Sequence, residues 1–307
     1  MQHTIFTYVL IFSIFFSYDL VAKSKDTKKE AKEVGQKCTP SKATPRITRS
    51  QVYRNKPFKA KEEARYDVYY GAVRVHVGYG FIRVGNPERR EISVIDQGGQ
   101  VKRETRWHRI FETEGFTGDW YRFIFRAHDT AKAVSRPWDF GVSHFHMLQN
   151  EEKPFSSTLK KEKWLEFDHV DCVTKEKEIN YTKNKEDYDE NFLSPGSIDA
   201  LGVVFKLRTL NYKIGKKVRL PVYTSEKNWW LEVLPEKFEE VKIKGKTYNT
   251  VKLKLKSYLG KDLQQKGRLS AWIETKHPSR PLVKVEGELK FGSVYMELTD
   301  FSPGRSL

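Results

Sequence analysis

The chain is poor in cysteine and lacks the usual signatures of nucleic-acid binding. Its 307 residues contain only Cys38 and Cys172, which are too far apart for a zinc-finger spacing, and no basic recognition helix is present. The formal net charge is nevertheless +16. Residues 23–60 hold twelve Lys or Arg and three Asp or Glu, a net charge of 12 − 3 = +9, so more than half of the excess lies in one short segment. The remaining surface is mildly basic, and we expect no nucleic-acid partner.

Apolar runs long enough to span a bilayer comfortably are also lacking. The longest run, IFTYVLIFSIFFSY, covers residues 5–18, and its 14 residues have the length of a secretory signal core. We expect a signal peptide over residues 1–22, cleaved after Ala22, and a periplasmic or otherwise exported protein. Because no Lys or Arg precedes the run, an uncleaved membrane anchor stays an alternative.

Recognisable catalytic motifs are missing as well. The sequence has neither the Gly-x-Ser-x-Gly of a nucleophile elbow nor a Walker loop. His144 and His146 have the His-x-His spacing of metal ligands on one face of a strand, but two ligands do not make a site. We expect no cofactor and no catalytic residues, and we keep these histidines only as weak metal candidates.

The segment after the signal peptide, residues 23–60, has no sustained apolar periodicity and contains Pro40 and Pro45. We expect a basic flexible linker that can make peripheral contact with an anionic membrane. Residues 61–307 then form a single β-rich domain, because apolar and polar residues alternate from about residue 64 onward. Hairpin turns are expected around Gly98-Gly99 and around Gly245-Lys246.

Helix signals are confined to short pieces. The best of them predicts a helix from Ile198 to Leu207, with Ser197 as the N-terminal cap and Asp199 favouring the amino end. The predicted fold class is therefore all-β and mainly antiparallel. We expect a strongly curved sheet, a sandwich or an incomplete barrel with few short helices.

Glycines are expected to shape this sheet. In VKVEGELKFGSVYMEL, residues 283–298, the inward apolar residues have odd numbers up to Phe291 and even numbers from Val294 onward. We interpret the change as a β-bulge at Phe291-Gly292 within one long strand. Gly78 is expected to mark a bend or a close approach of two backbones.

Two residue pairs carry open alternatives. Cys38 and Cys172 either pair, which would contribute up to about 4 to 5 kcal/mol by closing a long loop, or are unrelated thiols. Trp229 and Trp230 point to opposite faces of a strand. One is expected in the core, and the other either lines a ligand groove or packs over a sheet edge.

Several short motifs occur in a characteristic order along the chain. They are Tyr66-x-Val68, Gly78, Leu207-Arg208-Thr209, Gly215 followed by Leu220-Pro221-Val222, Trp272-Ile273, and Phe291 to Val294. In these features the chain resembles, over residues 57–302, the exported bacterial proteins of domain-of-unknown-function family 3108. The turn at Arg280-Pro281 departs slightly from the family pattern, which has one residue between Arg and Pro. The resemblance implies a β-rich envelope protein of bacteria with an outer membrane, and it supplies no catalytic residues.

The sequence thus predicts an exported, non-enzymatic envelope protein that binds an apolar or amphipathic molecule such as a lipid. One alternative is an interaction or scaffold protein whose basic tail contacts anionic envelope polymers or lipids, and another is a hydrolase. An apolar cavity would favour the first hypothesis and a filled interior the second. Clustered polar residues with perturbed pKa values would favour the third.

Overall fold

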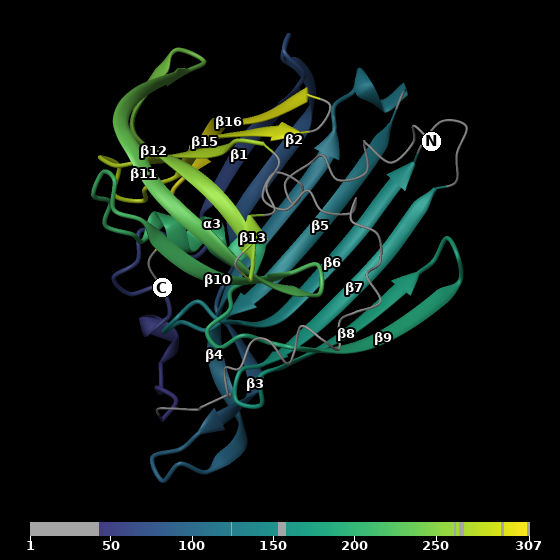
Figure 1. Cartoon of the computed structure of the whole chain (residues 1–307), viewed down its shortest axis with the longest axis vertical. Coiled ribbons are helices and arrows are strands. Elements are labelled where there is room, and N and C mark those ends of the chain that lie inside the picture. Colours follow the sequence, from purple (N-terminus) through teal and green to yellow (C-terminus); the bar gives the residue numbers. More distant parts are fainter. Residues whose placement is uncertain are drawn as a thin grey trace.

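The computed structural model describes residues 43–123, 125–152, 158–260, 262–263, 267–289 and 292–305, apart from the side chains of residues 121 and 289. Most of this part of the chain is β-strand, and its strand pairs are antiparallel (Figure 1). The predicted all-β, antiparallel fold class is confirmed.

Elements of the N-terminal half come first. In chain order they are η1 (Arg49–Gln51), β1 (Glu63–Tyr70), β2 (Val75–Val84), β3 (Glu88–Ile95), β4 (Val101–Thr117), η2 (Tyr121–Phe123), β5 (Arg126–Ser135), β6 (Val142–Glu152), β7 (Leu159–Asp168), β8 (Val173–Asn180) and β9 (Lys185–Phe192). Those of the C-terminal half are α3 (Ala200–Arg208), β10 (Val218–Thr224), β11 (Lys227–Ile243), β12 (Lys246–Leu259), β13 (Asp262–Leu263), β14 (Leu269–Glu274), β15 (Leu282–Leu289) and β16 (Gly292–Ser302).

The sixteen strands of the described residues belong to one sheet made of two meanders. Its order is β10-β11-β12-β14-β15-β16-β1-β2-β4-β5-β6-β7-β8-β9, with β13 added on β12 and β3 on β4. Each meander is built from neighbours in sequence, including the predicted hairpins between β3 and β4 and between β11 and β12. The two meanders are joined by the antiparallel ladder between β1 and β16.

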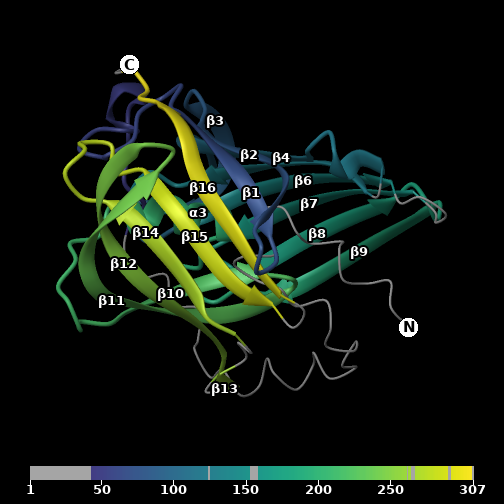
Figure 2. The same cartoon turned by 90° about the horizontal axis from the view of Figure 1, so that it is seen from above.

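The sheet curls until its two edges approach each other, as Figure 2 shows from above. Tyr223 of β10 accepts a hydrogen bond of 2.9 Å from the hydroxyl of Thr174 in β8, and its ring packs edge-on against Phe167 of β7. Asn228 of β11 donates a 2.8 Å hydrogen bond to the carbonyl of Phe192, where β9 ends. Among the described strands β9 and β10 remain the two ends of the sheet order. The fold is therefore an incomplete barrel.

Helix α3 packs inside this curl, between the two meanders. It begins two residues later than predicted, because Ile198 is held in a parallel bridge with Val222 of β10. The cap is Asp199 and not Ser197: the Asp199 carboxylate accepts hydrogen bonds from the N–H groups of Leu201 at 3.0 Å and Gly202 at 3.2 Å. Eight of the nine helical residues are buried, so the helix is part of the core.

A buried ion pair fixes the carboxyl end of α3. Arg208 Nη1 lies 2.7 Å from Glu62 Oε1, and both side chains are only 3% exposed. The same guanidinium donates hydrogen bonds to the carbonyls of Ser279 and Arg280, in the turn between β14 and β15. The Leu-Arg-Thr motif and the Arg-Pro turn that carry the family resemblance are thus in direct contact.

The expected linker ends earlier than residue 60. Val52 and Phe58 are fully buried in the main core, and the backbone of Ala60 bridges to Arg305. The prediction of a flexible segment is therefore wrong for the described residues 43–60. Five of these eighteen residues are Lys or Arg, but the apolar residues between them pack into the core and hold the segment on the domain. Residues 1–42, with the expected signal peptide, lie outside the described residues.

The predicted bulge at Phe291-Gly292 is also wrong. Residues 282–302 form two strands, β15 and β16, that pair antiparallel from Lys284 with Glu297 to Leu289 with Gly292. Paired residue numbers here add up to an odd number, so inward positions change from odd in β15 to even in β16 without any extra residue. Phe291 lies outside the described residues, whereas Gly292 begins β16 with a φ of +132°.

Candidate functional site

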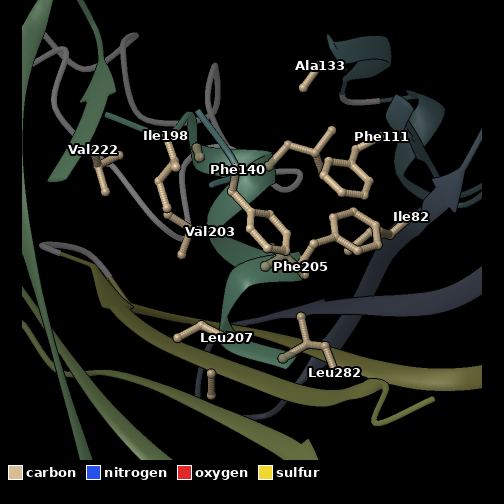
Figure 3. Close-up of a cluster of buried hydrophobic side chains, with 14 of the residues drawn as sticks. Ile82, Phe111, Ala133, Phe140, Ile198, Val203, Phe205, Leu207, Val222 and Leu282 are labelled. Atoms are coloured by element: carbon tan, nitrogen blue, oxygen red, sulfur yellow. The ribbon is translucent and has the colours of Figure 1, made fainter. Parts of the chain in front are cut away.

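The interior of the curl is filled by the protein's own aromatic side chains. Figure 3 shows Phe205 reaching from α3 to Phe111 of β4, and the two rings stack with centroids 3.8 Å apart. Phe58 packs edge-on against both rings, at 5.5 Å from Phe111 and 5.2 Å from Phe205. A ligand of the kind that hollow barrels enclose would have to displace this cluster.

Beyond the helix, the inner face of β7 and β8 is charged farther along the strands from the core residues Leu165 and Phe167. Lys163 forms an ion pair with Glu176, and it lies 3.5 Å from Glu178 and 3.5 Å from Glu226 of the β10–β11 turn. Burial alone would lower the pKa of Lys163, but the attraction of Glu176 and then of Glu226 outweighs it and raises that pKa. The part of this face around Lys163 is held together by charge pairs and does not resemble an apolar ligand cavity.

The most exposed apolar side chains instead lie at one rim of the sheet. Trp120 is 89% exposed and Phe123 is 82% exposed in the loop between β4 and β5, while Val73 and Val75, at the turn between β1 and β2, are 85% and 46% exposed. The two connections adjoin, since the N–H of Gly118 donates a 2.9 Å hydrogen bond to the carbonyl of Val77. They lie at the upper end of the sheet in Figure 1. We call Val73, Val75, Trp120 and Phe123 the apolar rim.

Local chain geometry explains why these side chains point away from the core. Strand β4 pairs with β2 as far as Thr117, and the chain then turns at Gly118 into the short 3-10 helix η2. The β1–β2 turn is closed by a hydrogen bond of 3.1 Å from the N–H of Arg74 to the carbonyl of Gly71, which has a φ of +78°. Both connections extend past the last residues of the sheet, so nothing in the sheet covers their apolar side chains.

Arginines surround the apolar rim in weak surface pairs. Arg74 lies 2.6 Å from Glu297, Arg122 lies 3.3 Å from Asp119, and Arg126 contacts Glu152 at 3.6 Å. In the pairs of Arg122 and Arg126 both partners are more than half exposed, and ion pairs this exposed contribute about 0 to 1 kcal/mol each. The guanidinium groups can therefore exchange their carboxylates for other anions at little cost.

An aromatic band lies on the outer face of the sheet directly below the rim. Rings of Tyr69, His76, Tyr79 and Phe116 follow one another at centroid distances of 5.5, 4.7 and 5.5 Å. Arg65 stacks over Tyr79 at 4.9 Å. The rim and band together give a surface that is apolar at the tip and amphipathic below it.

Other residues predicted from the sequence are separated from this rim in the fold. Trp229 is buried in the core and donates a hydrogen bond to the Thr224 carbonyl at 3.0 Å, whereas Trp230 on the opposite face is 37% exposed. A ligand groove at these residues stays a prediction. His146 contacts Glu162 at 2.7 Å and His144 contacts the hydroxyl of Ser143 at 3.2 Å.

The described residues offer neither a metal site nor a helix that could span a membrane. In that part of the chain no group of three or more His, Cys, Asp or Glu side chains could hold a metal ion. Nor does any helix of these residues have both the length and the apolar character needed to cross a bilayer.

Of the two cysteines, Cys172 lies among the described residues. Cys172 is 1% exposed and occupies a left-handed conformation, with a φ of +57°, in the turn between β7 and β8. Cys38 lies outside the described residues, so the disulfide between them stays a prediction.

Gly78 and Gly215 are required for different reasons, the first by a close contact and the second by its backbone conformation. A Cβ atom on Gly78 would lie 2.4 Å from the carbonyl oxygen of Phe116 on the neighbouring strand, which is too close for any side chain. Gly215, with a φ of +76°, donates its N–H to the carbonyl of Pro235 at 2.9 Å in the connection from α3 to β10.

Neither the apolar rim nor the ion pair between Glu62 and Arg208 was predicted from the sequence. A signal for the first was present in Gly-Asp-Trp-Tyr-Arg-Phe, where aromatic residues directly follow a turn-forming dipeptide at residues 118–119. The pair between Glu62 and Arg208 has no local signal, because its members are far apart in the chain.

A curved, unclosed antiparallel sheet around one helix, with an apolar rim, defines a β-rich protein of the incomplete-barrel class. Comparison with protein families then gives the particular assignment. The chain belongs to the family described as "Protein of unknown function (DUF3108)", whose model matches residues 65–299. This confirms the resemblance seen in the sequence. No curated protein matches the chain.

Solved structures that this chain resembles include a β-barrel-like protein of domain of unknown function DUF1849 from Brucella abortus. Its sequence is 10% identical, the match covers 80% of this chain and 98% of the Brucella chain, and the TM-score is 0.45. A presumed lipoprotein from Parabacteroides distasonis is 10% identical over 80% of this chain and 97% of its own, with a TM-score of 0.30. A presumed exported protein with a YmcC-like fold from Bacteroides fragilis is 9% identical over 80% and 98%, with a TM-score of 0.28. Similarities this low support no inference about function.

Proposed function

We propose that this protein is an exported, non-enzymatic envelope protein that docks on a lipid surface through its apolar rim. The observation that carries the proposal is the exposure of Trp120 and Phe123, at 89% and 82%, beside the exposed valines of the β1–β2 turn. Large apolar side chains that gather at one tip of a soluble protein mark a site of interaction. Tryptophan is also the residue most suited to the boundary between lipid headgroups and acyl chains.

Groups below the rim fit the headgroup layer. Tyr69 and Tyr79 present amphipathic rings at the outer face, and Arg74 stacks at 5.1 Å over the ring of Tyr69. With the rim inserted into the acyl boundary, the tyrosines and arginines would lie level with the phosphates, where cations near an anionic surface contribute about 1 kcal/mol each. This order of apolar tip, aromatic band and cations is the one expected of a peripheral membrane protein.

The filled interior also bears on the proposal. The first hypothesis from the sequence placed an apolar or amphipathic molecule in a cavity, but the centre of the curl holds the helix α3 and its aromatic cluster. Binding at the rim keeps the amphipathic ligand and moves it from the inside of the sheet to its edge. It needs no displacement of the core.

The basic tail is a second source of membrane affinity. With residues 43–60 packed on the domain, the part left for such a role is residues 23–42, which hold seven Lys and three acidic residues, a net charge of 7 − 3 = +4. Its attraction to anionic lipid would weaken as salt is added, with a Debye length of about 8 Å at physiological ionic strength. Contact by the rim would persist at high salt, so the two contributions are separable.

The test is flotation of the full chain with vesicles of phosphatidylethanolamine and phosphatidylglycerol at low and high salt. We expect the double variant Trp120→Ser/Phe123→Ser to lose about 3 kcal/mol of partitioning free energy, which is roughly a 100-fold weaker partition coefficient. A matched control, Val101→Ser/Ile214→Ser, removes two exposed apolar side chains elsewhere on the molecule. The control should bind as the unchanged protein does.

Trp120 can also report its own depth. With brominated lipids, quenching of tryptophan fluorescence should be strong in the unchanged chain and largely lost in Trp120→Phe, although six other tryptophans remain. Equal flotation of the rim and control variants would overturn the proposal. Binding abolished by salt alone, or by deletion of residues 23–42, would assign the membrane contact to the basic tail.

A further inference from the structure

Three cations surround a single buried phenylalanine ring at the end of the sheet opposite the apolar rim. Lys56 Nζ lies 5.7 Å from the centroid of the Phe140 ring, Lys206 Nζ lies 5.1 Å from it, and Arg109 Cζ lies 4.7 Å from it. They come from the segment before β1, from the last turn of α3 and from β4. Only tertiary folding brings them together.

Arg109 is the least accessible of the three. Its side chain is 1% exposed, its Nε donates a 2.9 Å hydrogen bond to the carbonyl of Val52, and its Nη2 donates to the carbonyl of Pro137. Within the described residues its Nη1 has no hydrogen-bond partner. A buried guanidinium nitrogen left without an acceptor costs free energy, so a partner for it is expected.

The local charge is poorly balanced. The carboxylate near the cluster is Asp139, and it already pairs with Arg136, by 3.1 Å from Nε to Oδ1 and 2.5 Å from Nη2 to Oδ2. Burial lowers the pKa of Lys56, and repulsion by Arg109 and Lys206 lowers that pKa further. Burial likewise lowers the pKa of Arg109, to about 10.

We propose that Lys56, Arg109 and Lys206 form a binding site for an oxyanion of the phosphate type. The buried Nη1 of Arg109 would bind one oxygen from the interior side. The two lysines are half-buried and flexible, so their ammonium groups can close on the anion from the solvent side. Free phosphate is the ligand the geometry favours, because the cluster lies beside the β5–β6 turn at the far end of the sheet from the apolar rim.

The site also explains a choice of residues that stability alone would not favour. Like charges grouped around one ring repel, and buried cations without a counter-charge are costly. A bound anion turns this cost into attraction and ties the segment before β1 to α3. Phosphate should therefore stabilise the folded chain by binding to it and not to the unfolded chain.

The test is thermal unfolding of the full chain in phosphate against chloride at constant ionic strength. The unchanged protein should show a saturable rise in melting temperature with phosphate. Lys56→Gln/Lys206→Gln should weaken the apparent phosphate affinity by about tenfold or more. It should also be more stable than the unchanged chain in chloride, because it removes repulsion. The control Lys59→Gln/Lys213→Gln removes two exposed lysines and should respond to phosphate as the unchanged chain does.

Two further arms separate the sources of the anion. Line broadening of inorganic phosphate in ³¹P NMR should appear with the unchanged chain and vanish with the double lysine variant. Soluble dihexanoyl phosphatidic acid, which also carries a phosphate monoester, should compete with it if the site accepts a lipid headgroup and should leave it unaffected if the site admits free phosphate only. Equal responses of the site and control variants, or no saturable effect in the unchanged chain, would overturn the proposal.

Discussion

Removal of Arg208 should be among the most damaging single changes in this chain. In Arg208→Met, the carboxylate of Glu62 stays 3% exposed but loses its cation, and the carbonyls of Ser279 and Arg280 lose their donor. Breaking a buried ion pair from one side costs about 3 to 5 kcal/mol. For a domain of this size that is roughly a 6 to 20 °C lower melting temperature, at about 2 to 4 °C per kcal/mol.

Urea denaturation followed by circular dichroism measures this cost. Glu62→Gln should cost less, about 1 to 3 kcal/mol, because Arg208 keeps its carbonyl acceptors. The double variant Arg208→Met/Glu62→Gln should cost less than the sum of the two single changes, because the second change removes the stranded carboxylate. Arg219→Met is the control: Arg219 is 60% exposed and 3.3 Å from Glu232, so its loss should cost under about 1 kcal/mol. A loss at Arg208 no larger than at Arg219 would refute the reasoning.

Three further changes test other parts of the fold. Gly292→Val should lower the free energy of unfolding by about 1 to 3 kcal/mol in chemical denaturation. The φ of +132° is strained for a β-branched residue, and the Cβ would lie 3.1 Å from Tyr70 Oη. An unchanged midpoint would contradict this. Burial raises the pKa of Asp129 from 3.8 to about 6. The folded state therefore favours the protonated carboxyl, and the free energy of unfolding falls as the pH rises from about 4 to 6. Asp129→Asn should stabilise the chain by about 1 to 3 kcal/mol in thermal unfolding at pH 7 and by little at pH 4. Equal effects at both pH values would count against this prediction. If Cys38 and Cys172 pair, reductant should lower the melting temperature of the unchanged chain but not of Cys172→Ala, and two thiols titrated in unreduced, unfolded protein would exclude the pair.

The fold class was predictable because the β period is local. Alternation with a period of two is visible within six or eight residues, so strands and hairpins could be placed without knowing what lies across the sheet. The error at Gly292 has the same origin. A bulge and a two-residue hairpin connection both change the parity of the inward residues, and only the pairing of Leu289 with Gly292 tells them apart.

The proposed sites could not be predicted in the same way. The turn-forming dipeptide before Trp120 marks the end of a strand, but the exposure of Trp120 and Phe123 depends on the position at which β4 loses its partner. No local pattern in the sequence indicates that Lys56 and Arg109 lie close together. They become a cluster only because Phe58 is drawn into the core and carries the preceding residues with it.

The joining of the two meanders at β1 and β16 has a consequence for how the chain folds. Within each meander most strands pair with a neighbour only a few residues away, so those contacts close short loops and form early. The β1–β16 ladder instead joins Tyr70 to Val294 and must close a loop that includes nearly the whole domain. Helix α3, placed between β9 and β10 in the sequence, is enclosed only when this happens. We therefore expect the two meanders to form partly independently and to dock late. The final, slow event would be formation of the β1–β16 ladder together with the enclosure of α3.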